Sequence, residues 1–288
     1  MAYHCFEVEI TSYVAHVKFC RPDKRNSMTP EFWNEFPRLI DKLDSSGDVR
    51  VIVLSSSGPH FTAGMDLCVF AGASKDSISA SNVQIRAAKF YDTVKRLQNT
   101  FSCLAQVRVP VLAAIQGGCI GAGVDLATAC DMRYASKETF FTIQETNIAM
   151  TADVGTFPRL GKLIPDGIVR ELAYTGRSMP AEEAHRWGLV NAVYDSHEDM
   201  LEGVMNIAHS IATKAPMAIF GCKKMIQYSQ DHTVADTLDY VGIWNASFFN
   251  KAEIMESMIA KQEKREPNYN ALPSKALAHE DTDLAQIE

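Results

Sequence analysis

Short apolar runs that alternate with helical patterns constrain the fold of this 288-residue chain more than any other feature. Val49–Leu54 and Val109–Ile115 are rich in Val, Ile and Leu, as is typical of strands covered on both faces. Met132–Ala135 and Phe140–Ile143 are predicted as further strands. Strands that recur with helices between them predict an α/β fold, in which the order ββα repeats in space without a clear sequence repeat.

The N-terminal part is expected to begin with two paired strands. Cys5–Glu9 and Val14–Phe19 alternate apolar and polar residues, which is the period of a half-buried strand. Thr29-Pro30-Glu31 then combines an N-cap, a proline at the first helical position and an acidic first turn, so it predicts a helix start. Pro37 is expected to kink or shorten this helix.

The second half of the chain is predicted to be mostly helical. The expected elements are a helix from Pro180 to Gly188, a strand over Leu189–Val193, and helices over Ser196–Thr213, Pro216–Tyr228 and Thr233–Lys264. The last helix is long and amphipathic, and so much apolar surface often packs on another subunit. We therefore predict a core with the active site over residues 1–200, a C-terminal helical region over 201–265 and a loose tail over 266–288.

Composition excludes several classes of protein. A net charge of −7 argues against nucleic-acid binding, and no apolar run reaches the roughly 20 residues that span a membrane. The N-terminus carries no secretory or transit signal, and the C-terminus carries no peroxisomal tripeptide. Seven scattered cysteines without a Cys-x-x-Cys pair indicate reduced thiols. A bacterial source predicts the cytoplasm, whereas a mitochondrial or peroxisomal location stays open for a eukaryotic source.

Two glycine-containing turns follow buried strands. Gly117-Gly118 and Gly121-Ala122-Gly123 come after the strand that ends at Ile115, and they precede the helix-like Val124–Cys130. Free backbone N–H groups at such a helix start can hold an oxyanion. Thr62-Ala63-Gly64-Met65 is another such turn; it comes earlier in the chain and is called the first turn, and residues 117–123 are called the second turn. Two N–H groups that converge on one carbonyl stabilise a transition state by roughly 3 kcal/mol each. The alternative is that both clusters are simple tight turns.

Three carboxylates accompany the second turn. Asp125, Glu145 and Asp153 stand among mostly apolar neighbours, where unpaired carboxylates are rare. If they lie close together, their pKa values move apart, and they supply an acid and a base. Their spacing equally allows a capping role for Asp125 and solvated loop positions for the other two.

Four motifs, taken in order, resemble the crotonase (enoyl-CoA hydratase/isomerase) superfamily. They are FTAGMDL at 61–67, QGGCIGAGVDL at 116–126, ACDMR at 129–133 and WGLV at 187–190. Residues 140–145 with 152–156 and Arg159-Leu160 are similar to the Δ3,5-Δ2,4-dienoyl-CoA isomerases within it. Hydratases resemble the chain at Glu145, but they carry glutamate in place of Asp125 and typically glycine in place of Asp153.

The resemblance implies a spiral of ββα units with a C-terminal helical region that forms trimers, or hexamers as dimers of trimers. It also implies a coenzyme A thioester substrate and no metal or redox cofactor. The thioester carbonyl would be held by the N–H groups of Met65 and Ala122, where Ala122 replaces the usual glycine. The flanking substrate-binding positions would be Ala63, Gly64, Asp66 and Gly121. Arg25 would meet the coenzyme A phosphates, and surface solvation is its alternative.

The same resemblance implies a 1,5-proton transfer. Glu145 would act at C2 and Asp153 at C6, although the reverse assignment stays open, and Asp125 would tune Glu145. The competing activities are hydration of 2-enoyl-CoA and a Δ3-Δ2 double-bond shift. A different class is a non-catalytic protein of this fold that binds acyl-CoA or RNA.

Overall fold

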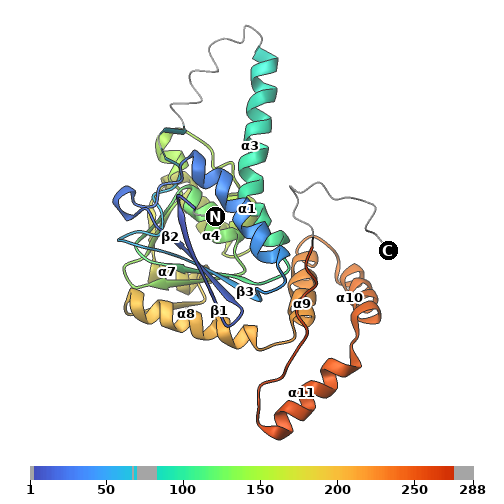
Figure 1. The fold of residues 1–288 in the computed structure, drawn as a ribbon. Helices are drawn as coiled ribbons and strands as arrows, with labels where there is room; N and C mark the ends of the chain where they lie inside the picture. Colours follow the sequence, from blue (N-terminus) through green and yellow to red (C-terminus); the bar gives the residue numbers. More distant parts are fainter. Residues whose placement is uncertain (1–2, 67, 70–82, 276–288) are drawn as a thin grey trace.

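The computed structural model describes residues 3–66, 68–69 and 83–275 (Figure 1). Leu67 of the first motif and the predicted tail beyond residue 275 lie outside the described residues. The architecture is α/β, as predicted. The strands are β1 Phe6–Thr11, β2 Val14–Phe19, β3 Val51–Ser56, β4 Val111–Ile115, β5 Gly118–Ile120, β6 Met132–Ser136, β7 Phe140–Thr142, β8 Ser178–Pro180 and β9 Ala192–Tyr194.

Helices cover these strands along the whole described chain. The α-helices are α1 Pro30–Ser45, α3 Val83–Gln106, α4 Ala122–Ala129, α5 Thr156–Leu160, α6 Asp166–Thr175, α7 Ala181–Trp187, α8 His197–Ala212, α9 Pro216–Tyr228, α10 Val234–Phe248 and α11 Lys251–Glu263. Two short 3₁₀ helices, η1 Pro22–Lys24 and η2 Glu145–Ile148, lie between them. No helix of the described residues is both long enough and apolar enough to cross a membrane.

Two sheets form the core. The main sheet has six strands in the order β1-β2-β3-β4-β6-β9, and the smaller sheet has the order β5-β7-β8. Apart from the antiparallel pair β1–β2, the main sheet is parallel. Every residue of β3 and β4 is buried, as expected of parallel strands that are covered on both faces.

The predicted ββα repetition is present. β4, β5 and α4 follow one another, and β6 and β7 repeat the first two steps before the short helices η2 and α5. β6 pairs with β4 in the main sheet, and β7 pairs with β5 in the smaller sheet. Each turn of the chain therefore adds one strand to each sheet, and the glycine turn after β5 lies beside the segment that follows β7.

Two predicted elements differ in detail. α1 continues through Pro37 to Ser45, so the expected shortening was wrong. The strand predicted at Leu189–Val193 begins only at Ala192. Leu189 lies in the turn after α7, where Gly188 adopts a φ of 86°. Its burial in this turn, and not a strand, accounts for the apolar residue at this position.

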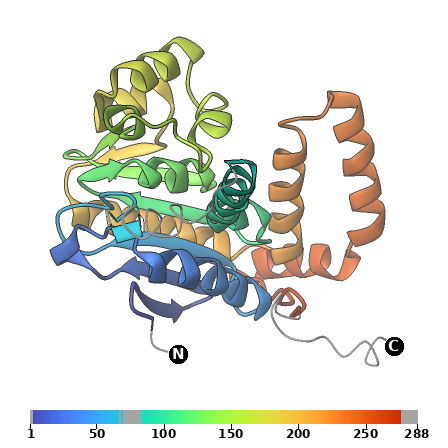
Figure 2. The same cartoon turned by 90° about the horizontal axis from the view of Figure 1, so that it is seen from above.

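The helix predicted over Thr233–Lys264 is two helices, α10 and α11. Phe249 is extended with φ −66° and ψ 113°, which ends α10. Asn250 then accepts hydrogen bonds from the N–H groups of Ala252 and Glu253, so it caps α11. The helices α9, α10 and α11 stand to one side of the two sheets (Figures 1 and 2).

The helix α8 lies against the main sheet, and it crosses residue 200, the predicted end of the core. Its buried residues Met200, Val204 and Ala208 join Val51 and Val53 of β3 in one apolar cluster. Residues up to Ala212 therefore help to cover the sheet.

Residues 266–275 pack on the core, so the loose tail predicted from residue 266 was wrong for this part. Leu272 is buried. Arg108 donates a hydrogen bond of 2.7 Å to the carbonyl of Pro273, and the N–H of Lys275 donates one of 3.1 Å to the carbonyl of Ser45. Polar composition suggested solvation here, but backbone carbonyls with long-range arginine donors order the segment.

A buried lysine attaches α9 to the core. The Nζ of Lys223 donates to the carbonyls of Leu104 at 2.8 Å and Val109 at 2.9 Å, and to the carboxylate of Asp131 at 2.7 Å. The same Asp131 oxygen accepts the N–H of Val111 at the start of β4. One ammonium thus joins the end of α3, the start of β4 and the C-terminal helices.

Candidate active site

The two glycine turns lie side by side. Thr62 pairs with Cys119 in a parallel bridge, so the first turn runs along β5. Gly64 adopts a φ of 83°, which favours glycine, and an added Cβ would lie 2.6 Å from the carbonyl oxygen of Ile120 and 3.4 Å from the nitrogen of Ala122. The backbone of Gly64 therefore lies directly against the backbone at the N-terminus of α4. The two turns are adjacent, which a pair of converging N–H donors requires.

Met65 and Ala122 present N–H groups that have no acceptor in the described part of the chain. By contrast, the N–H groups of Ala63, Gly64 and Gly121 all donate hydrogen bonds inside the protein. Ala122 is the first residue of α4, whose intrahelical bonds start later. Two unsatisfied donors on adjacent turns are the arrangement that can hold a carbonyl oxygen as it gains negative charge.

Glu145 lies over the second turn. Gly121 has φ 53° and ψ −118°, and a Cβ there would lie 3.3 Å from the Oε1 of Glu145. The Oε2 of Glu145 is buried and has no hydrogen-bond partner in the described residues. Burial raises the pKa of Glu145 to about 7, and the nearby carboxylates of Asp125 and Asp153 act in the same direction.

Asp125 is fully buried within α4, and it does not cap that helix. Its Oδ1 instead accepts hydrogen bonds from the N–H of Thr156 at 2.6 Å and from the hydroxyl of Thr156 at 2.8 Å, at the start of α5. Burial raises the pKa of Asp125 to about 6, against the lowering effects of Thr156 and Arg159. Its Oδ2 has no partner in the described residues.

Asp153 belongs to the same cluster. Burial raises the pKa of its carboxyl group, and its charge in turn raises the pKa values of Asp125 and Glu145. The Nε2 of Gln98 on α3 donates a 2.8 Å hydrogen bond to the carbonyl of Asp153. The three acids, from α4, η2 and the segment before α5, thus form one electrostatically coupled group. They are neither isolated from one another nor fully solvated.

Asp66 and Arg25 are the two charged residues among the predicted substrate-binding positions. Asp66 accepts hydrogen bonds from the hydroxyl of Ser27 at 2.6 Å and from the N–H of Cys68 at 3.0 Å, and these bonds lower its pKa to about 2. Its carboxylate therefore fixes the loop after the first turn. The backbone carbonyl of Arg25 accepts a 2.9 Å hydrogen bond from the N–H of Ala63, and the side chain of Arg25 is exposed.

Asn26 is a supporting residue that sequence patterns did not identify. It is buried, it has a φ of 51°, and its Nδ2 donates to the carbonyls of Ser57 at 2.8 Å and His60 at 2.9 Å. Its own carbonyl accepts the hydroxyl of Thr62 at 2.7 Å. A signal existed, because asparagine tolerates left-handed backbone in a polar turn, but its long-range partners are visible only in the structure.

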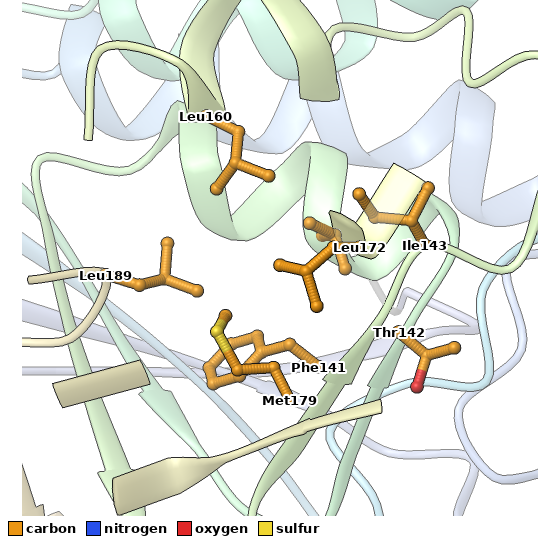
Figure 3. Close-up of a pocket in the computed structure, with 8 residues that line it drawn as sticks. Phe141, Thr142, Ile143, Leu160, Leu172, Met179 and Leu189 are labelled. Atoms are coloured by element: carbon orange, nitrogen blue, oxygen red, sulfur yellow. The ribbon is translucent and has the colours of Figure 1, made fainter. Parts of the chain in front are cut away.

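A small apolar cavity lies between side chains of α4, α5, α6 and the smaller sheet (Figure 3). Its volume is about 10 Å³, and it is lined by Val124, Phe141, Thr142, Ile143, Leu160, Leu172, Met179 and Leu189. This volume is close to the minimum for a single water molecule, so the cavity is too small for an acyl chain. Val124 and Ile143 of this lining come one and two residues before Asp125 and Glu145, and apolar surroundings favour the neutral forms of both acids.

Comparison with known proteins gives a consistent result. The chain matches the family model for enoyl-CoA hydratase/isomerase over residues 9–272. It is 40% identical over 270 residues to the Δ(3,5)-Δ(2,4)-dienoyl-CoA isomerase, mitochondrial, of Pongo abelii, with 91% of this chain and 81% of that protein covered. It is 38% identical to the peroxisomal isomerase of the same name from Arabidopsis thaliana, with 91% and 94% covered.

Solved structures share the fold. A putative enoyl-CoA hydratase from Streptomyces coelicolor A3(2) superposes with a TM-score of 0.83 at 27% identity, over 93% of this chain and 95% of that one. The family match covers β2 to β9, both glycine turns and the three acids. The chain therefore belongs to the enoyl-CoA hydratase/isomerase family.

Proposed function

We propose that the protein isomerises 3,5-dienoyl-CoA to 2,4-dienoyl-CoA. The observation that carries the proposal is the placement of Asp153 in one group with Glu145 and Asp125, beside two free N–H donors. A shift of two double bonds needs a proton acceptor at one end of the diene and a donor at the other. The similarity to relatives that are named dienoyl-CoA isomerases supports this choice.

The chemistry follows from the residues. The N–H groups of Met65 and Ala122 hold the thioester oxygen, which acidifies the C2 proton. Glu145 takes this proton; the electrons of the broken C–H bond pass into a dienolate that is delocalised to C6. Asp153 gives a proton to C6, and the protein and substrate together neither gain nor lose a proton. A base whose pKa is about 7 suits removal of the C2 proton near neutral pH.

Asp125 acts on Glu145 from the buried side. Its charge raises the pKa of Glu145, and the two partnerless oxygens, Oδ2 of Asp125 and Oε2 of Glu145, leave room for a shared proton. Every step uses backbone N–H groups and carboxyl groups of this chain, so the proposal includes no metal or redox cofactor. The exposed guanidinium of Arg25, on the loop that holds Ala63, would meet the phosphates of coenzyme A.

A homotrimer, alone or paired into a hexamer, is part of the proposal. α10 and α11 expose large apolar side chains at Leu238, Ile243, Phe248, Met255 and Met258. A soluble chain seldom leaves so many of them on one pair of helices uncovered. Sedimentation velocity of the purified protein tests this, and a monomer at micromolar concentration would contradict it.

Isotope exchange tests the chemistry. The purified protein is assayed with 3,5-dienoyl-CoA, and formation of the conjugated diene is followed by its absorbance. We expect Asp153→Asn to abolish the product while deuterium from D₂O still enters C2, because Glu145 remains. Glu145→Gln should block this exchange. The exposed Asp48→Asn is the matched control.

Other outcomes are equally informative. Exchange at C2 in Glu145→Gln but not in Asp153→Asn would reverse the two roles. Hydration of 2-enoyl-CoA faster than isomerisation, or full turnover by Asp153→Asn, would refute the proposed reaction. Failure to bind any acyl-CoA in calorimetry would favour a non-catalytic member of the family.

A further inference from the structure

Arg159 is a half-buried cation whose guanidinium meets no carboxylate in an ion pair within the described residues. Its Nη2 donates to the hydroxyl of Ser102 at 3.0 Å, and its Nη1 donates weakly to the carbonyl of Val154 at 3.4 Å. Burial lowers the pKa of the guanidinium below its usual range. A cation that forms no ion pair but whose charge acts on Asp125 calls for an explanation beyond packing.

The guanidinium lies against the backbone of Gly155. Gly155 adopts a φ of 133°, and an added Cβ would lie 2.0 Å from the Nη1 of Arg159 and 2.8 Å from its Cζ. A side chain at this position would therefore displace the guanidinium, whatever the backbone conformation. This close contact between the guanidinium and Gly155 holds Arg159 against the segment that carries Asp153.

Four consecutive residues of this segment, 153–156, are held by three partners. Gln98 binds the carbonyl of Asp153, and Arg159 binds the carbonyl of Val154 and covers Gly155. Thr156 is fixed by the carboxylate of Asp125. Gln98 and Ser102 lie one helical turn apart on α3, so the same face of α3 supports both tethers.

We propose that Arg159 is a positioning residue for the proton transfer, which sets the place of Asp153 and provides the counter-charge of Asp125. The inference rests on the proposed isomerase function. The groups whose charges act on Arg159 are Asp125 of α4, Cys103 of α3 and Cys130 after α4. Burial raises the pKa of both thiols to about 12, so they stay neutral, and Asp125 is the group among these three that titrates near neutral pH.

The variants separate position from charge. Arg159→Met removes both, so we expect kcat to fall by roughly tenfold to a hundredfold. Without Arg159, Asp125 stays protonated to higher pH and raises the pKa of Glu145 less, so the acidic limb of the pH profile should move to lower pH. Arg159→Lys keeps the charge and loses the planar fork, so kcat should fall while the limb stays in place. Wild-type kcat and an unmoved limb in Arg159→Met would overturn the inference.

A second pair of variants covers the case in which Arg159→Met does not fold. Ser102→Ala removes the partner of the guanidinium and leaves every charge in place. We expect a severalfold lower kcat at unchanged KM. Thr93→Ala removes a hydroxyl from the exposed face of the same helix and is the control. Equal rates in the two variants would overturn the positioning role.

Direct titration keeps the inference separate from the proposed reaction. Carbon NMR of protein labelled at the aspartate carboxyl groups, with Asp125→Asn for assignment, gives the titration midpoint of Asp125 without any turnover. We expect a higher midpoint in Arg159→Met than in the wild type. If the wild type fails to isomerise 3,5-dienoyl-CoA but the midpoint still moves, the proposed function fails and the counter-charge stands. An unmoved midpoint refutes the counter-charge.

Discussion

Replacement of Asp125 by asparagine is expected to flatten the pH dependence of stability. Asp125 is fully buried, and its pKa rises from 3.8 to about 6 on folding. A folded-state pKa above the unfolded value means that the protonated carboxyl stabilises the fold. This contribution is complete below about pH 4 and is lost as the pH rises through about 6.

The size of the effect follows from the same values. One pKa unit corresponds to about 1.4 kcal/mol, so the rise from 3.8 to about 6 amounts to about 3 kcal/mol between pH 4 and pH 8. In Asp125→Asn, the amide oxygen can still accept both hydrogen bonds from Thr156. The new amide N–H₂ replaces the partnerless Oδ2, and a buried unpaired donor costs about 1–3 kcal/mol at every pH.

The assay is thermal unfolding of wild type and variant at one protein concentration from pH 4 to pH 8. We expect the melting temperature of Asp125→Asn, relative to the wild type, to rise by roughly 6 °C across this range, at about 2 °C per kcal/mol. Asp48→Asn changes an exposed carboxylate and should run parallel to the wild type. A constant difference between Asp125→Asn and wild type would refute the reasoning.

Three further outcomes are expected. Lys223→Met leaves the half-buried carboxylate of Asp131 without its cation, so the free energy of unfolding should fall by about 1–3 kcal/mol in denaturant titrations, whereas exposed Lys224→Met should change little. Gly121→Ala adds a Cβ 3.3 Å from Glu145 in a strained conformation, so kcat should fall and stability should drop by about 1–3 kcal/mol; unchanged values for both would contradict this. The kcat of the wild type should rise with pH through about 7 as Glu145 ionises. This limb should move to lower pH in Asp125→Asn, since the charge of Asp125 in the wild type raises the pKa of Glu145.

The local parts of the fold could be predicted because they depend on short-range patterns. The Thr29-Pro30 start of α1 and the buried runs of β3 and β4 were predicted correctly, as was the alternation of β2. The break between α10 and α11 was missed, since the apolar period continues across Phe249 while the cap at Asn250 is a single-residue signal. Continuous amphipathicity therefore concealed a turn.

The site was predictable in its chemistry but not in its supports. The two glycine turns and the three acids followed from residue type and motif. The roles of Gln98 and Arg159 depend on the contact between α3 and the segment before α5, which joins positions about 55 residues apart along the chain. The resemblance included Arg159 without giving it a role, and nothing in the local sequence distinguishes Gln98 from a surface residue. The packing of residues 266–275 was missed for the same reason.

The pairing of β6 with β9 also bears on the order of events during synthesis. Tyr134 pairs with Ala192, so the chain between these strands is a closed loop that carries Glu145 and Asp153. Asp125 and both glycine turns leave the ribosome long before β9 does. A nascent chain that stops short of residue 192 holds every carboxyl group of the site, yet the strand that closes the loop is missing. We therefore expect catalytic competence to arise in one late step, after most of the main sheet can already form.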